Sequence, residues 1–590
     1  MIEKIILSIL ILILPGIILS LILFNRKEIT IIEFYSLSQA LSIATLAFIT
    51  SILLFMNILI NIYIIYALIS VFIIIIFILK YFLKLKVKLI FDKYQLLALI
   101  FLLVPISYYI LYFYSEPYFS LTPSGDPYYY VFHYKTLYEG DIISYYANRL
   151  SIFAPALFLV SFPLDIPFSF ISIRYLTAYF DILTGLMIYS ATLVSTKNKK
   201  WALIALLCFN IILFVNYSAY FVSGLFANIL ANFLSFALIY LIFYLKEENL
   251  KSYFFLTILT LTVLAMHISV GLLLIALLIY FLLTFRKKAF ALPTKNSLAV
   301  IVPFLILTIL GFTVIKTGEI PLLVYFFQYA LGETGFIVVT PGDQTGDSFS
   351  YIINNYFRFL IPYISIASQY FLLLYPLLII PFISFKFYKE KYISFNLIWF
   401  FVILILSNIF FGQYYRFSYQ LYLPTVILLS FFIYKAFDKF SDFISNIKLL
   451  KRPIYALSLI FLIIVSISTG MFMGVKFGYQ VSVLKAFNSY ENSIFNAMNY
   501  IKENFSDYTV ISTATSMEYL TFYYNIKVVS GIFKPQELNY TGKFIVVISE
   551  GEYYFQHDNS TEKLDLVLEY EKAGFRKVYE NEHVVIFLPP

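Results

Sequence analysis

The sequence predicts a polytopic α-helical membrane protein with a small C-terminal external α/β domain, and three observations predict it. Of its 590 residues, 61% are apolar and 13% are charged, whereas a soluble domain has about 45–50% apolar and about 25% charged residues. Apolar segments long enough to cross a hydrocarbon core recur along most of the chain. After about residue 476 the sequence instead becomes charged and alternating. These features exclude a soluble enzyme and a disordered chain.

Apolar segments predict about fourteen membrane spans. All but one lack an interior charge; the exception, 172–193, contains Asp181 near its middle. The first segment is interpreted as a span, because its apolar stretch of about 20 residues exceeds the ~7–15 of a signal-peptide core. The predicted spans are 5–24, 33–55, 58–79, 94–114, 172–193, 201–216, 219–245, 253–266, 268–285, 297–315, 361–385, 394–411, 418–437 and 454–475.

Lys and Arg collect in every second connection, which is typical of cytoplasmic loops. If each segment crosses once, the alternate connections face outward, as do both termini. The outward pieces are 115–171, 316–360 and the tail. The basic connections are at 26–27, 80–88, 197–200, 246–251, 286–288, 386–391 and 435–452.

Three parts follow from this pattern: additional spans at 1–93, a membrane domain at 94–476 and an external α/β domain at 477–590. The tail predicts helices near 494–504, 517–524 and 563–574. Strands are expected at 508–512, 526–530 and 543–549, followed by a hairpin of 576–579 and 583–587.

Composition also limits the chemistry. Cys208 is the single cysteine, which excludes an intrachain disulfide and a cysteine-based zinc site. The formal net charge is +8, but Lys and Arg lie mainly in the loops of one side, so no nucleic-acid partner is expected.

The outer segment 123–134 follows a predicted span directly and contains Gly125-Asp126-Pro127. A carboxylate on such a turn, just above the bilayer, is placed to act as a general base. The surrounding rings can stack on sugars or lie in the headgroup layer. The structural alternative is an Asp126 that caps a helix beginning near Tyr128.

The order of several features resembles the GT-C class of polyprenyl-phosphate-sugar glycosyltransferases, in its protein mannosyltransferase-like and aminoarabinose transferase-like branch. These features are Gly125-Asp126 opening a large outer loop, a path through Tyr and His to Leu137-x-x-Gly140, and about a dozen spans. An outer Arg416 near Tyr422-Leu423-Pro424 and the outward α/β domain complete them. The resemblance covers roughly residues 94–590.

The resemblance implies inverting transfer of a sugar from a polyprenyl (dolichyl)-phosphate donor to a protein, glycan or lipid acceptor at the outer face of the cell membrane. It makes Asp126 the catalytic base, and Arg416, Arg358 and His267 the groups that meet the lipid phosphate. The expected substrate-binding residues are Tyr128, Tyr129, His133, Glu139 and Asp141.

Physical chemistry agrees with these roles but leaves alternatives open. An arginine at the outer end of a span can bind phosphate by two parallel hydrogen bonds, or it can anchor the chain at the headgroups. His267 can instead make an ordinary polar contact. Asp126, His133, Glu139 and Asp141 lack the spacing of a zinc motif; no cofactor is assigned, and a divalent cation stays an open alternative.

Two other classes of function compete with the transferase. Asp181 inside a span indicates a transporter or lipid flippase, since an ionisable group there is costly and usually functional. A non-catalytic envelope scaffold is the third class. An oligosaccharyltransferase is disfavoured, because its Trp-Trp-Asp-Tyr-Gly motif is absent and the two tryptophans, Trp201 and Trp399, lie at spans.

Overall fold

The computed structural model describes most of the predicted spans and part of the tail. The described residues are 2–56, 58, 60–115, 137, 153–163, 166–210, 226–267, 271–285, 294–313, 316–317, 320–321, 380–409, 420, 422–445, 485–513, 526–530, 534–538, 542–549 and 561–590. This part of the chain is mostly helical. Its apolar helices are those of a membrane-associated protein.

Six helical stretches among the described residues are long and apolar enough to cross a membrane. They occupy α1 (Ile2–Leu23), α2 (Ile31–Phe55), α3 with its π-helical end (Ile62–Phe77, Ile78–Phe82), α4 with α5 (Lys93–Phe101, Leu103–Ser115), α9 (Ile166–Thr196) and α12 (Phe226–Tyr244). Each overlaps a span predicted from the sequence.

Other predicted spans appear as shorter apolar helices or lie partly outside the described residues. The shorter apolar stretches are Leu250–Met266, Leu272–Thr284, Lys295–Ile306, Lys391–Ile405 and Leu423–Ala436. They belong to α13 (Leu250–Met266), α14 (Gly271–Phe285), α15 (Thr294–Thr313), α19 (Lys391–Ile409) and α21 (Tyr422–Ser445). Two further helices, α8 (Phe153–Ser161) and α10 (Lys199–Cys208), complete the described bundle.

Side-chain caps fix where several helices begin. Thr30 and Glu33 form a reciprocal capping box at the start of α2: the Glu33 N–H donates to the Thr30 hydroxyl, and the Thr30 N–H donates to the Glu33 carboxylate, both at 3.2 Å. Asp92 accepts from the N–H groups of Tyr94 and Gln95 at the start of α4. Asn198 and Asn249 cap α10 and α13 in the same way.

One hydrophobic core joins the bundle from Leu7 on α1 to Phe431 on α21. The first helices therefore pack into the same core as the later ones. Gly16 allows α1 and α2 to approach closely, because a Cβ at this position would overlap the backbone oxygen of Ser38. The Ser38 hydroxyl donates to the Ser20 hydroxyl at 2.7 Å, and the Ser42 hydroxyl donates to the Leu12 carbonyl.

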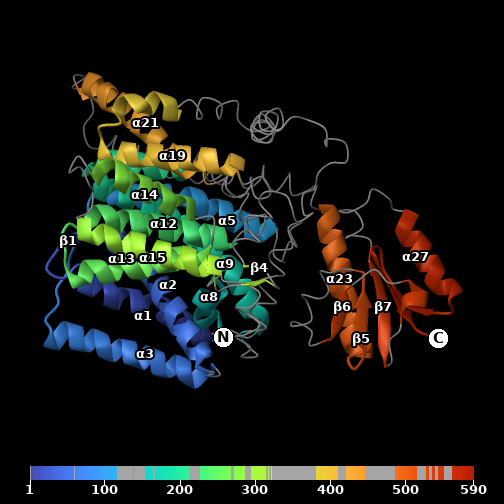
Figure 1. Ribbon diagram of the computed structural model, residues 1–590. Coiled ribbons are helices and arrows are strands. Elements are labelled where there is room, and N and C mark those ends of the chain that lie inside the picture. Colours follow the sequence, from blue (N-terminus) through green and yellow to red (C-terminus); the bar gives the residue numbers. More distant parts are fainter. Residues whose placement is uncertain are drawn as a thin grey trace.

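Two small pairs of strands lie at opposite ends of the bundle (Figure 1). Strand β1 (Glu28–Thr30) pairs in parallel with β2 (Lys88–Ile90) in the basic connections before α2 and α4. Strand β3 (Lys316–Thr317) pairs with β4 (Ile320–Pro321) after α15. The β1–β2 pair lies at connections predicted to be cytoplasmic, and the β3–β4 pair lies in a connection predicted to face outward. The helices of the bundle separate these two pairs.

The C-terminal residues form a mixed five-stranded sheet in the order β6-β5-β7-β9-β8. Its strands are β5 (Thr509–Ser512), β6 (Val528–Ser530), β7 (Phe544–Ser549), β8 (Arg576–Glu580) and β9 (Val584–Leu588). β5 pairs in parallel with β6 and β7, while β9 runs antiparallel to β7 and β8. All five lie at or next to positions predicted as strands.

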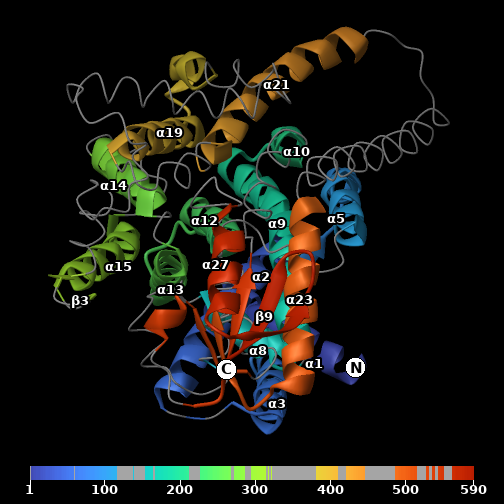
Figure 2. The same cartoon turned by 90° about the vertical axis from the view of Figure 1, so that its right-hand side faces the viewer.

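Alternating residues of this sheet enter two separate cores. Ile545 and Val547 of β7 pack with α23 (Lys485–Asn504), whereas Phe544 and Val546 pack with α27 (Thr561–Lys572). The two helices therefore cover opposite faces of the sheet (Figure 2).

Candidate functional site

The residues singled out in the sequence fall mostly outside the described part of the chain. His267 and Asp181 are described. The others, which lie outside the described residues, are Asp126, Tyr128, Tyr129, His133, Glu139, Asp141, Arg358 and Arg416.

One end of the bundle is marked by charged groups from the basic connections. The Lys199 ammonium lies 2.6 Å from the Asp92 carboxylate, which joins the starts of α10 and α4. The Lys295 ammonium lies 3.8 Å from the Glu248 carboxylate, which joins the start of α15 to the connection between α12 and α13. We call this the basic end.

The ion pair at the basic end affects the titration of Asp92. Partial burial acts to raise the pKa of this carboxyl, but the hydrogen bond from Lys199 and those from the backbone of Gln95 and Tyr94 outweigh it. The pKa of Asp92 is therefore lower than its ordinary value, and the carboxylate stays ionised at neutral pH.

Lys246 experiences the opposite kind of environment at the same end. Burial, together with repulsion from Lys391 and Lys197, lowers the pKa of Lys246 to about 8. Positive charge is thus concentrated where α9, α12 and α19 meet the basic connections.

Asp181 lies inside the bundle and is fully buried. Its Oδ2 accepts a 2.5 Å hydrogen bond from the hydroxyl of Tyr109 on α5. Its Oδ1 has no hydrogen-bond partner in the described part of the chain. The hydrogen bond between Tyr109 and Asp181 therefore connects α5 to α9 inside the bundle.

Helix geometry places Asp181 well away from the basic end. At a rise of about 1.5 Å per residue, Asp181 lies about 22 Å from the end of α9 at Thr196, and Tyr109 about 24 Å from Lys93. Phe180 packs on Phe233 of α12 with ring centroids 5.4 Å apart, so α12 passes at this level too.

His267 lies at a similar axial distance from the basic end, at the end of α13. It is the C-terminal cap of α13, with extended backbone at φ −159° and ψ 134°. The axial distance from Leu250 is about 26 Å. His267 therefore lies at the end of the bundle opposite the basic end. That this end faces outward stays a prediction.

Groups of metal ligands are absent from the part that the structure describes. No three His, Cys, Asp or Glu side chains there are arranged to hold a metal ion. Cys208, which is buried, is an unpaired cysteine on α10, as a chain with one cysteine requires.

A pocket of about 350 Å³ opens at the basic end between α9, α10, α19 and α21. Trp201 forms part of its wall, with its ring stacked on Tyr434 at 6.0 Å and 8° and its Nε1 donating to the Ser430 hydroxyl at 2.9 Å. The lining residues are Ser195, Thr196, Asn198, Trp201, Glu390, Lys391, Tyr392, Phe431, Tyr434 and Lys435.

Neither this pocket nor the Tyr109 contact is among the sequence predictions. The sequence does contain a signal for the pocket, because its lining residues lie in or within a few residues of three basic connections assigned to one side of the membrane. The sequence contains no signal that identifies Tyr109 as the partner of Asp181, because 20% of the chain is aromatic and spacing does not distinguish Tyr109 from its neighbours.

When the chain is compared with protein-family models and with curated proteins, neither comparison yields a match.

Proposed function

We propose that this protein is a membrane glycosyltransferase that moves a sugar from a polyprenyl-phosphate donor to an acceptor at the outer face of a cell membrane. Asp126 accepts the proton of the attacking hydroxyl as the anomeric carbon is displaced from phosphate with inversion. Arg416, with Arg358, stabilises the charge that develops on the departing lipid phosphate. The lipid chain of the donor stays in the bilayer, which accounts for an enzyme built from membrane helices.

One observation supports this proposal above the others: the described helices that precede Asp126, Arg358 and Arg416 in the sequence, namely α5, α15 and α19, all run away from the basic end. The pocket at the basic end contains Tyr392 near the start of α19 and Lys435 in the second half of α21. α19 therefore leaves this end, and α21 returns to it. The end of α19 at Ile409 and the start of α21 at Tyr422 consequently lie at the opposite end. Arg416 falls between these two helices in the sequence.

The helices α5 and α15, which precede Asp126 and Arg358 in the sequence, also end away from the basic end. α4 and α5 lead away from Asp92 for about 34 Å, to Ser115. α15 leads away from the Lys295 ion pair to β4, which lies at the far end from β1 (Figure 1). The described helices that precede Asp126, Arg358 and Arg416 in the sequence therefore all run away from the basic end, as the proposed meeting of these three groups requires.

The number of membrane spans and the side on which each connection lies are part of the same proposal. We assign fourteen spans, cytoplasmic basic connections, and an external position for 115–171, 316–360 and the C-terminal sheet. Substituted-cysteine labelling in a Cys208→Ser background tests this assignment. A cysteine at position 126 is expected to react with a membrane-impermeant maleimide added outside intact cells, and one at position 198 only after lysis. The reverse pattern contradicts the proposal.

Activity is tested on purified full-length protein in nanodiscs, with radiolabelled polyprenyl-phosphate sugars and an extract of envelope glycans, lipids and proteins. Release of polyprenyl phosphate reports on the reaction whatever the acceptor is. Asp126→Asn is expected to lower the rate by about 10²–10⁴-fold while the donor still binds, because it removes the base. Arg416→Gln is expected to lower both the rate and donor affinity.

Matched variants on the C-terminal sheet and helix control for the loss of charge. Asp565→Asn on α27 and Arg576→Gln on β8 remove the same groups at positions given no part in the reaction. Equal rates for Asp126→Asn and Asp565→Asn, at unchanged thermal stability, would refute the assigned base. No release from any donor of the panel by the unmodified protein would refute the transferase.

A further inference from the structure

The pocket at the basic end has no part in the proposed transfer, which takes place at the other end of the bundle. Its volume of about 350 Å³ lies within the range of small-molecule sites, about 300–1,000 Å³. It is enclosed by α9, α10, α19 and α21. Of these, α10 begins at the Asn198 cap and at the ion pair between Lys199 and Asp92.

Aromatic rings form much of the wall. Trp201 contacts Phe431 with centroids 5.0 Å apart and Tyr392 with centroids 6.0 Å apart. The hydroxyl of Tyr392 lies 3.2 Å from that of Thr192 on α9. Ring faces in such a wall attract an ammonium group through their quadrupoles.

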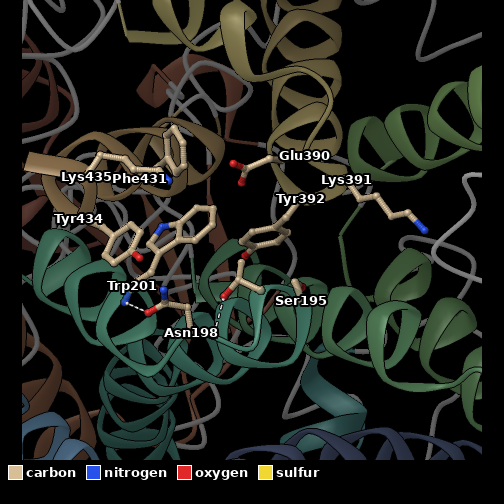
Figure 3. Close-up of a pocket in the computed structure, with 10 residues that line it drawn as sticks. Ser195, Asn198, Trp201, Glu390, Lys391, Tyr392, Phe431, Tyr434 and Lys435 are labelled. Atoms are coloured by element: carbon tan, nitrogen blue, oxygen red, sulfur yellow. Dashed lines mark hydrogen bonds between the residues drawn. The ribbon is translucent and has the colours of Figure 1, made fainter. Parts of the chain in front are cut away.

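Two opposite charges line the same space. The Lys435 ammonium lies 5.4 Å from the ring centroid of Phe431 and 5.7 Å from that of Tyr434, which holds it against the aromatic wall. Figure 3 shows the Glu390 carboxylate directed toward the side of the pocket where Trp201, Phe431 and Lys435 lie, while Lys391 extends away. Within the described part of the chain, neither Glu390 nor Lys435 has an ion-pair partner within 4.0 Å.

This pairing restricts the ligands that fit. A simple anion would meet Lys435 but would be repelled by Glu390, and a simple cation would meet Glu390 but be repelled by Lys435. A molecule that carries both charges satisfies both side chains. Lys391 is among the lining residues, and Lys197 lies in sequence between the lining residues Thr196 and Asn198. This further positive charge near the pocket favours phosphate as the anionic group.

We infer that this pocket binds a zwitterion that carries an ammonium and a phosphate, with the ammonium between Glu390 and the ring of Trp201 and the phosphate at Lys435. Such a group occurs as an aminoalkyl phosphate headgroup of a membrane lipid and as the free aminoalkyl phosphate. The pocket lies where basic connections meet apolar helices, and both sources reach that boundary.

The chain supplies its own reporter for binding. It has two tryptophans; Trp201 lines the pocket, and Trp399 is buried on α19 and stacked on Phe395. Trp399→Phe leaves Trp201 as the single tryptophan. Its fluorescence is then measured in a maltoside detergent during titration with dihexanoyl phosphatidylethanolamine, phosphoethanolamine or dihexanoyl phosphatidate. Calorimetric titration of the unmodified protein repeats the measurement without the substitution.

A saturable change with either amine-bearing probe is expected. Equal affinity for phosphoethanolamine and its lipid indicates a soluble ligand, whereas saturation by the lipid alone indicates a headgroup; both outcomes support the inference. No saturable signal with either amine-bearing probe, in fluorescence and in calorimetry, would overturn it.

Glu390→Gln separates ligand recognition from a structural role of this side chain. It is expected to weaken binding of the amine-bearing probes about threefold to tenfold, since it removes one partly exposed charge contact. The same variant is expected to bind phosphatidate more tightly, because a repulsion is removed. Lys435→Gln is expected to weaken all phosphate-bearing probes.

Lys389→Gln is the matched control, because it removes a neighbouring exposed charge that does not line the pocket. It is expected to leave all three affinities within about twofold. If Glu390→Gln shifts phosphatidate and phosphatidylethanolamine in the same direction, the assignment of Glu390 to the ammonium is wrong.

Discussion

The hydroxyl of Tyr109 on α5 donates a 2.5 Å hydrogen bond to Oδ2 of Asp181 on α9, and both side chains are buried. In the described part of the chain the second carboxyl oxygen of Asp181 has no hydrogen-bond partner. The only described donor to this carboxyl group therefore comes from another helix. A buried polar group that loses its partner is destabilising, so this contact is sensitive to substitution.

Tyr109→Phe is expected to lower the free energy of unfolding by about 1–3 kcal/mol, because it leaves a buried carboxyl group without its donor. The midpoint of thermal unfolding in detergent measures the effect. Tyr66→Phe provides the comparison: its hydroxyl donates to Glu3 at the same 2.5 Å but on the exposed surface, and its loss is expected to have little effect. The Tyr109 effect should disappear in an Asp181→Leu background.

Asp181→Asn distinguishes transfer from transport. The amide oxygen of Asn can still accept the hydrogen bond from Tyr109, so the helix contact is retained. If the protein is a glycosyltransferase with Asp126 as its base, sugar transfer by this variant is expected to stay within about threefold of the unmodified rate. Unchanged transfer in Asp126→Asn, combined with loss of lipid or solute flux in Asp181→Asn, would favour the transporter.

Gly16→Ala is expected to destabilise the protein strongly, since the new methyl group would overlap the backbone oxygen of Ser38 and force α1 and α2 apart. Gly185→Ala is the graded comparison. There the nearest atoms are Leu206 Cδ1 at 2.9 Å and Asn210 Oδ1 at 3.0 Å, which belong to side chains that can move. The yield of monodisperse protein and its unfolding temperature should fall further for Gly16→Ala than for Gly185→Ala.

Lys246→Met is expected to raise the unfolding temperature at pH 7 by about 1–3 °C. The pKa of Lys246 falls from 10.5 to about 8 in the folded protein, so between these values the unfolded chain binds more protons and stability rises with pH. The lysine is thus unfavourable below pH 8, and its penalty disappears near pH 10.5. The advantage of Lys246→Met should therefore shrink as pH rises; an advantage that grows with pH would contradict this origin.

Periodicity and hydropathy are sufficient to predict most of the described helices and all five strands of the C-terminal sheet. β7 illustrates the reason: Phe544–Ser549 is a run of β-branched and apolar residues that is buried throughout, which is typical of a central strand. The capping box of Thr30 and Glu33 is equally visible in sequence, because its two residues are three apart.

Contacts between helices far apart in sequence could not be predicted in the same way. Tyr109 and Asp181 are separated by 72 positions, and any of many aromatic residues could face a buried acid. The pocket residues Trp201 and Tyr434 come together because α10 and α21 pack side by side, which depends on the three-dimensional arrangement of the helices. The predicted base and phosphate-binding arginines lie outside the described residues and stay predictions.

The parallel pairing of β1 with β2 has a consequence for biosynthesis. The backbone of Glu28–Thr30 pairs with Lys88–Ile90, so this ladder can form only after α3 has been synthesised and has left the ribosome. Until then the hairpin of α1 and α2 lacks the backbone pairing between β1 and β2. We expect the orientation of these early helices in the translocon to become permanent only when Lys88–Ile90 has emerged, which pulse-labelling of nascent chains truncated before and after that point would reveal.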